Sequence, residues 1–348
     1  MFGRNGLLAL LSSGAVLAGV NTVAAEGAAT FFEEAGEISM IISSSPGGGY
    51  DAYGRLIADY MSKHLPGEPD VIVQNMPGGG GMRAANYLAN AADQDGTVIS
   101  MMARGVPIAP LLYGAESGAE FDPAEFGWIG SLNSEVGVGL VSTASEVTTI
   151  DEVKEREIFF GSSGVESTPS MYGRLLNTLG GTKINMLNGY AGQTEYFLAM
   201  ERGETDGMFI TGWSGPNRVK AMQAHEAGQI RYIVQLATEP YPEFGDTPTL
   251  LDVVEGEEDE QVVRLLLAQL DLGRPVITPP NVPEDRLELL RAAFDAALAD
   301  PEFLDAAARL ELDIEPIHGE AAEEMMAAVY QTPESVIARA REIVTFTE

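Results

Sequence analysis

The sequence predicts an α/β fold built from two units, each with a mainly parallel sheet. Short apolar runs typical of strands alternate with helical patterns between residues 38 and 102, and the same alternation returns between residues 137 and 210. A group of helical patterns then fills the last 70 or so residues. In sheets of this kind the loops that lead from strands into helices gather at one edge, which is where such folds bind ligands.

The elements follow from the apolar spacing, taken in chain order. In the first unit we expect strands at 38–42, 71–74 and 97–102 and helices at 52–65 and 82–92. In the second unit we expect strands at 137–142, 158–161 and 206–210 and a helix at 168–179. No repeat of solenoid length is present. The acidic stretch 255–260 is expected to be a solvated surface loop.

The C-terminal helices are expected to cover the first unit. One begins with Pro283 and two acids, carries an apolar stripe, and ends at Pro301. Further helices are expected at 321–330 and 336–343. The first domain would then be discontinuous, comprising 36–135 plus 272–348, with 136–271 as the second domain. The chain would cross between the domains twice, an arrangement that suits hinge closure around a ligand.

The first 25 residues read as an export signal. Arg4 supplies a positive charge, 7–20 form an apolar core, and Val23-Ala24-Ala25 is a small-residue cleavage site. An ordinary N-terminal core helix is the alternative. The chain has no cysteine, so it lacks thiol catalysis, disulfides and the acceptor for a lipid anchor. We expect a soluble periplasmic protein.

The net charge of −32 comes from 52 acidic and 20 basic residues. Such a surface repels nucleic acid and anionic lipid headgroups, so neither is expected as a partner. A salt-adapted source explains the charge better than a functional acidic patch. An anionic ligand must therefore be held by local donors against an unfavourable overall field.

The most informative motif joins the first strand to the first helix through Pro46-Gly47-Gly48-Gly49-Tyr50-Asp51. Glycines let backbone amides approach a ligand, and the unpaired N–H groups of a helix start attract anions. A dinucleotide fingerprint with Asp70 fits only loosely, and a phosphate-binding loop fails because Gly54 is followed by Arg55. A plain flexible turn remains an alternative.

Asp51 has two possible roles at this position. As a helix-capping residue it would accept backbone N–H bonds, which is structural. If it faces a ligand carboxylate instead, the two negative charges require an intervening water or ligand donor.

Two further loops repeat the arrangement. Pro77–Gly81 leads into a helix that contains Arg83, and Gly161–Pro169 joins a strand to a helix with several hydroxyls. Arg83 and Arg104 are candidate cations near these loops, although each is also a plausible surface residue.

Catalytic motifs are weak. The three histidines, His64, His225 and His318, have no metal-ligand spacing, and no HExxH motif occurs. The segment around Ser214 resembles a nucleophile elbow without its last glycine in register. We expect no enzyme activity, no metal and no cofactor, with a secreted serine hydrolase using Ser214 as the alternative.

Taken together and in order, the motifs resemble those of the substrate-binding proteins of tripartite tricarboxylate transporters, the Bug-type family. The matching segments span nearly the whole mature chain: 46–51, 73–81, 95–97, 161–164, 167–169, 189–192 and 203–206. The resemblance implies a two-domain type II periplasmic binding protein with a ligand cleft between the domains.

The resemblance also implies which residues meet the ligand. It assigns them to the glycine loop, the serine loop and a far wall: Gly48, Gly49, Tyr50, Asp51, Ser162, Ser163, Ser167, Thr168, Tyr190, Ala191, Gly192 and Asp206. It implies a small organic carboxylate as ligand, a membrane permease as partner, and a monomer. An orphan sensor that presents its ligand to a signalling receptor is a further alternative.

Three departures from the family pattern bear on the ligand. Glu166 stands where a glycine is common, Ser170 stands where a histidine is usual, and segment 189–192 lacks a lysine. These changes make the expected pocket more negative. A tricarboxylate would suffer most, so we expect a mono- or dicarboxylate, or an amino or aromatic acid.

Overall fold

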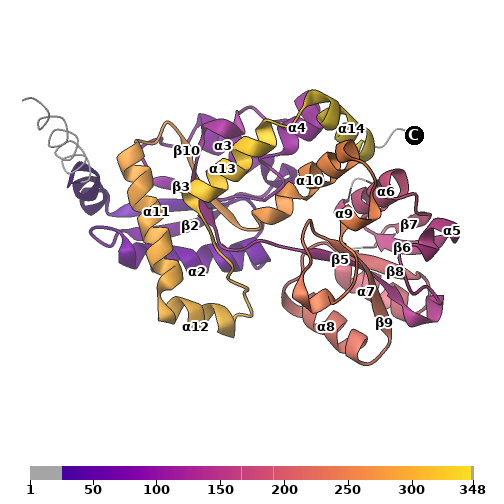
Figure 1. Cartoon of the computed structure of the whole chain (residues 1–348). Coiled ribbons are helices and arrows are strands. Elements are labelled where there is room, and N and C mark those ends of the chain that lie inside the picture. Colours follow the sequence, from indigo (N-terminus) through magenta and orange to yellow (C-terminus); the bar gives the residue numbers. More distant parts are fainter. Residues whose placement is uncertain (1–25, 166, 191, 346–348) are drawn as a thin grey trace, which may run out of the picture.

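The computed structural model describes residues 26–165, 167–190 and 192–345, and the expected signal segment 1–25 lies outside this part. Two sheets organise the molecule into two lobes (Figure 1). Within the described ranges no helix combines the length and apolar character needed to cross a bilayer.

The sheet of lobe 1 has six strands in the order β11-β4-β10-β3-β1-β2. Strands β1, β2 and β3 are parallel, whereas β10 runs antiparallel between β3 and β4. The bounds are β1 Glu37–Ile42, β2 Asp70–Asn75, β3 Val98–Met101, β4 Phe126–Ser131, β10 Pro275–Pro280 and β11 Ile317–His318.

The sheet of lobe 2 has five strands in the order β7-β6-β8-β5-β9. Strands β7, β6 and β8 are parallel, and β5 is antiparallel to both of its neighbours. The bounds are β5 Gly137–Ser142, β6 Ile158–Ser162, β7 Ile184–Asn188, β8 Gly207–Ile210 and β9 Ile230–Leu236. The α/β fold with two sheets is therefore confirmed, but the expectation that each sheet is mainly parallel is wrong, because only two of five strand pairs in lobe 1 and two of four in lobe 2 are parallel.

Helices cover both sheets. Those between the strands of lobe 1 are α2 Gly49–His64, α3 Met82–Asn90 and α4 Ala109–Tyr113. Those of lobe 2 are α5 Glu152–Glu155, α6 Thr168–Leu179, α7 Gln193–Glu201, α8 Gly215–Glu226 and α9 Leu250–Val253. The C-terminal part supplies α10 Glu257–Asp271, α11 Glu284–Ala299, α12 Pro301–Arg309, α13 Gly319–Tyr330 and α14 Glu334–Val344.

The prediction that the acidic stretch 255–260 is a surface loop is wrong in part. Glu257, Glu258, Asp259 and Glu260 form the first turn of α10. Carboxylates are favourable there because the helix dipole is positive at its N-terminus.

The chain passes between the sheets twice, once from β4 to β5 and once on the way to β10. Helix α10 packs against α14, a helix that follows the second passage and also contacts α4 and α6. We therefore propose that the second lobe ends near residue 256 instead of residue 271, with α10 at the junction.

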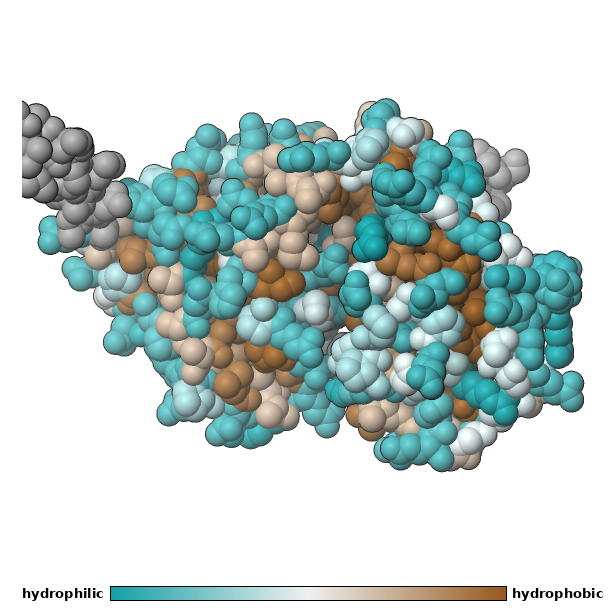
Figure 2. All heavy atoms as spheres, viewed as in Figure 1, coloured by the Kyte–Doolittle hydropathy of each residue, from teal (hydrophilic) through white to brown (hydrophobic). Residues whose placement is uncertain are grey.

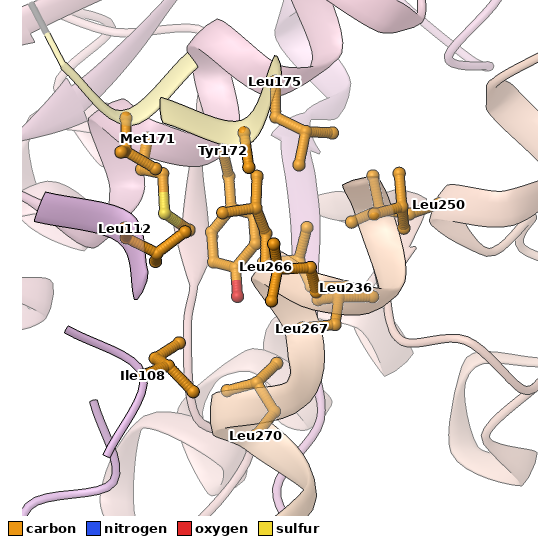
Figure 3. Close-up of a cluster of buried hydrophobic side chains, with 14 of the residues drawn as sticks. Ile108, Leu112, Met171, Tyr172, Leu175, Leu236, Leu250, Leu266, Leu267 and Leu270 are labelled. Carbon is orange, nitrogen blue, oxygen red and sulfur yellow. The ribbon is translucent and has the colours of Figure 1, made fainter. Parts of the chain in front are cut away.

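An apolar cluster fills the junction beside α10. It joins Leu266 and Leu270 of α10 to Leu112 of α4 and to Tyr172 and Leu175 of α6, all of them buried (Figure 3). The two lobes thus share one continuous hydrophobic core on this side.

Candidate ligand-binding site

The carboxyl ends of the parallel strands of the two lobes meet at the junction. Arg104 lies just after β3 of lobe 1, and its Nη2 donates a hydrogen bond to the carbonyl of Thr211, just after β8 of lobe 2, at 2.9 Å. Figure 2 shows the surface hollowed between the two lobes. The loops after β3 and β8 therefore meet at the junction, and those after β1, β2, β6 and β7 leave the same edges of their sheets.

In lobe 1 the glycine loop forms the start of α2. Gly48 is the N-cap, no side chain caps the helix, and both Gly48 and Gly49 are exposed. The helix begins three residues earlier than the expected Ala52, so the loop itself supplies the first helical amides. These amides lack intrahelical partners and are available to an anion.

Asp51 holds this loop in shape. Its carboxylate accepts the N–H of Gly47 at 2.9 Å, the amide of Asn75 at 2.9 Å, and Nη2 of Arg55 at 3.0 Å. The Arg55 guanidinium, with help from these other donors, lowers the pKa of Asp51 to about 2. Of the two roles considered, the contacts of the carboxylate favour the structural one.

Tyr50 connects the glycine loop to the next loop of lobe 1. Its hydroxyl oxygen accepts the backbone N–H of Arg104 at 3.0 Å. The phenolic hydrogen is thereby left to donate elsewhere, and the ring lies beneath the guanidinium of Arg274 at 4.5 Å from its centroid.

In lobe 2 the serine loop is shaped by internal hydrogen bonds. The buried hydroxyl of Ser162 donates to Asn188 and accepts from Ser170 at 2.9 Å. The single hydroxyl hydrogen of Ser170 is shared between Ser162 and the carbonyl of Gly164, which lies 2.8 Å away, and Ser167 donates to the same carbonyl at 2.7 Å. Ser163 is exposed. The hydroxyls of Ser162 and Ser167 thus shape the loop, which leaves Ser163 and the amides at the start of α6 for a ligand.

The remaining predicted residues of the far wall lie at the starts of helices or beside them. Thr168 is the first residue of α6, and Gly192 is the N-cap of α7, again without a side-chain cap. Tyr190 packs edge-on against Tyr196 with ring centroids 6.1 Å apart. Ala191, together with Glu166, lies outside the described residues.

Asp206 is not brought to this crevice. It directly precedes β8, whereas Ser162 ends the neighbouring parallel strand β6, so the two lie at opposite edges of the sheet. Its carboxylate accepts the N–H of Phe159 at 2.9 Å. It borders a separate groove of about 770 Å³ with Thr143 and Arg202. We therefore leave Asp206 out of the site proposed below.

Sequence reasoning missed the charged cluster at the centre of the junction. Glu135 lies on the first passage between the lobes, and its carboxylate forms ion pairs with Nη1 of Arg104 and, at 2.7 Å, with Nη1 of Arg274, which precedes β10 on the second passage. The side chains are 4%, 16% and 11% exposed for Glu135, Arg104 and Arg274. Arg104 was a candidate cation, but no local motif marks Glu135 or Arg274, because only the fold brings the two passages together.

The remaining residues considered in the sequence analysis, Arg83, the three histidines and Ser214, do not form a site together. Arg83 is exposed beside Gly78. All three histidines are engaged away from Ser214: His64 with Asp300, His318 with Asp295, and His225 stacked on Tyr232. No cluster of three or more potential metal ligands occurs among the described residues. Nothing in this arrangement favours a serine hydrolase.

Comparisons with known proteins agree with this architecture. The family model of the tripartite tricarboxylate transporter family receptor matches residues 54–340. A UPF0065 protein of Bordetella bronchiseptica is 24% identical over 272 residues, which cover 76% of this chain and 73% of that protein.

Two solved structures share the fold. A TctC solute binding protein from Polaromonas, solved without ligand, gives a TM-score of 0.67 at 20% identity and covers 87% of this chain and 98% of that chain. MatC from Rhodopseudomonas palustris, with bound malate, gives a TM-score of 0.57 at 21% identity and covers 89% of this chain and 99% of that chain. The chain belongs to the tripartite tricarboxylate transporter receptor family, and it is a solute-binding receptor with the two-lobe α/β fold of that family, not an enzyme.

Proposed function

We propose that this receptor binds a small organic carboxylate in the crevice between its lobes, a mono- or dicarboxylate in preference to a tricarboxylate. One observation supports the proposal: α2 of lobe 1 and α6, α7 and α8 of lobe 2 each begin after the carboxyl end of a parallel strand without a side-chain cap. Each offers unpaired amides and a positive dipole end to an anion.

The residues proposed to meet the ligand are the exposed amides and donors of these loops. In lobe 1 they are Gly48, Gly49 and the hydroxyl of Tyr50, and in lobe 2 they are Ser163, Thr168, Tyr190 and Gly192. Asp51, Ser162 and Ser167 act by holding the loops in shape. The malate in MatC, a protein with the same fold, supports a ligand of this chemical class.

Binding is proposed to draw the lobes together. A ligand that contacts both lobes stabilises the closed form by the contacts it makes only there. The receptor would then deliver the carboxylate to the membrane permease subunits of a tripartite transporter, acting in the periplasm after removal of residues 1–25. The family membership supports this route, and loss of carboxylate uptake on deletion of the receptor gene would test it.

A thermal-shift screen against organic acids tests the binding proposal. A ligand that binds only the folded chain raises the melting temperature by mass action, by an amount that grows with its concentration. We expect a shift with one or more mono- or dicarboxylates and smaller shifts with citrate. Amino acids and aromatic acids belong in the same screen.

Two variants sharpen this screen. Thr168→Pro removes the N–H of residue 168 at the start of α6, while Pro tolerates the first turn of a helix. It should weaken carboxylate binding, whereas Asp206→Asn at the far edge of the same sheet should not. Shifts with neutral sugars but with no organic acid would contradict the proposal.

A further inference from the structure

The charged cluster at the junction is not electrically balanced. Two guanidiniums, Arg104 and Arg274, share the single carboxylate of Glu135. All three side chains are more than four-fifths buried. Burying an uncompensated charge is unfavourable, so a spare positive charge in this position calls for an anion.

Among the described residues, the other acids near the junction form no ion pair with Arg104 or Arg274. Asp313 forms its ion pair with Arg218, which also binds Glu243. Asp271 ends α10, and burial alone raises its pKa to about 6, with no guanidinium offsetting that burial. Within the described part of the chain, Glu135 is therefore the one carboxylate that pairs directly with Arg104 and Arg274.

The spare charge faces the glycine loop. A Cβ added to Gly49 would lie 3.4 Å from Nη2 of Arg274, so this nitrogen borders the exposed first turn of α2. Nε of Arg274 is buried without a hydrogen-bond partner. The ring of Tyr50 supports the guanidinium from below. Arg274 thus has donor capacity that no protein group uses, next to the amides proposed to receive the ligand.

We propose that Arg274, held in place by Glu135, is the specificity-determining residue of this receptor and selects dicarboxylates over monocarboxylates. This inference rests on the proposed function. One ligand carboxylate binds Nη2 of Arg274 and the amides at the start of α2, and it completes the charge balance of the cluster. The second carboxylate meets the helix starts of lobe 2. A monocarboxylate satisfies only one of these two places, so it binds more weakly.

The test compares matched acids by isothermal titration calorimetry on the mature chain: succinate with butyrate, and adipate with hexanoate. Wild type should bind the better dicarboxylate at least about tenfold more tightly than its monocarboxylate counterpart. Arg274→Gln should weaken the dicarboxylate by about 10- to 100-fold and shrink the ratio, because a charge-assisted hydrogen bond is lost. Arg274→Lys keeps the charge and should retain the preference.

The control is Arg218→Gln, which removes an arginine of α8 that pairs with Glu243 and Asp313. It should leave the dicarboxylate-to-monocarboxylate ratio at the wild-type value. An unchanged ratio in folded Arg274→Gln would overturn the inference. If Arg274→Gln does not fold, loss of the preference in folded Arg274→Lys would overturn it, and its retention would support it.

The outcomes separate this inference from the proposed function. Wild type that binds carboxylates without preferring dicarboxylates overturns the role of Arg274 alone. Wild type that binds no organic acid overturns the proposed function and this inference with it.

Discussion

The two lobes are joined by two regions of opposite character. On one side, Leu266 and Leu270 of α10 and the ring of Tyr172 of α6 pack in an apolar cluster, in which the Tyr172 hydroxyl is the polar exception (Figure 3). On the other, Arg104, Glu135 and Arg274 form a buried charged group with a spare positive charge. Apolar packing is non-directional and indifferent to anions, whereas the charged group changes its energy when an anion arrives. The first region holds the lobes together, and the second makes their junction responsive to a ligand.

The largest expected effect comes from breaking the charged group. Glu135→Gln leaves two buried guanidiniums without their carboxylate, and we expect it to lower the free energy of unfolding by about 3–5 kcal/mol. Urea denaturation measures this loss. Adding a dicarboxylate or sulfate should recover more stability in the variant than in wild type, because the anion replaces the missing charge.

The matched control for that variant is Glu243→Gln. Glu243 pairs with Arg218 where both side chains are 28% exposed, so this better-hydrated pair should contribute less than the central one. A loss in Glu135→Gln no larger than in this control would show that the central cluster is not held as described.

The apolar region should respond to truncation and not to anions. Leu266 is fully buried, so Leu266→Ala should cost about 2–4 kcal/mol by lost burial and the cavity left behind. We expect the carboxylate affinity of the folded variant to stay the same. Leu304→Ala, at a leucine that is 44% exposed on α12, provides the control and should cost far less. A changed affinity in Leu266→Ala would contradict the division between the two regions.

Asp271 should make the free energy of unfolding fall as the pH rises. Because its pKa is raised by burial to about 6, the folded state binds a proton that the unfolded state releases above about pH 4. Ionisation of Asp271 therefore lowers the free energy of unfolding as the pH rises from about 4 to 6. Above about pH 6 the free energy of unfolding stays below its value at pH 4 by this contribution. Asp271→Asn should raise the free energy of unfolding at pH 7 by about 1–2 kcal/mol and remove that part of the slope.

A control for this change lies at the other end of the same helix. Glu258, in the first turn of α10, interacts favourably with the helix dipole, so Glu258→Gln should lower stability by a few tenths of a kcal/mol, roughly. Denaturation midpoints of wild type and both variants, measured between pH 4 and 8, test these expectations. An Asp271→Asn variant that is less stable than wild type at pH 7 would contradict the role given to Asp271.

The smallest effect concerns Tyr172. Its hydroxyl is buried without a partner, and burial raises the pKa of the phenol above its ordinary value. Tyr172→Phe removes this unsatisfied group and should stabilise the chain by about 1 kcal/mol. Tyr53→Phe is the counterpart, since the hydroxyl of Tyr53 donates to the carbonyl of Asp313 at 3.0 Å, and it should destabilise instead. A higher melting temperature for Tyr172→Phe together with a lower one for Tyr53→Phe would support an unpartnered Tyr172 hydroxyl. Changes of the same sign in both variants would refute it.

Strong local patterns predicted the α/β class and six of the strands, whereas β4, β7, β9, β10 and β11 were not predicted. The alternation that predicted β1, β2 and β3 and the helices after them reflects buried faces that any α/β layout requires. Strand β10 was missed because three of its six residues are prolines, which argue against a central strand, yet it lies between β3 and β4. Its register against β4 shifts at two points, one of them beside Pro279 and Pro280.

The loops of the site were predictable and the junction was not. Glycines and serines between a strand and a helix have a local chemical signature, so Gly48, Gly49 and Ser163 stood out. Asp206 was carried over from the family pattern, although it lies at the far edge of its strand. Glu135 and Arg274 are 139 positions apart in the sequence, and only the pairing of the two passages makes them neighbours.

A crystal structure of the chain with its tightest-binding carboxylate would show where the ligand lies. We expect one ligand carboxylate within hydrogen-bond distance of Nη2 of Arg274 and the amide of Gly49, with the rest of the ligand contacting the helix starts of lobe 2. A ligand bound instead in the groove beside Asp206, with the crevice free of it, would rule out the proposed site.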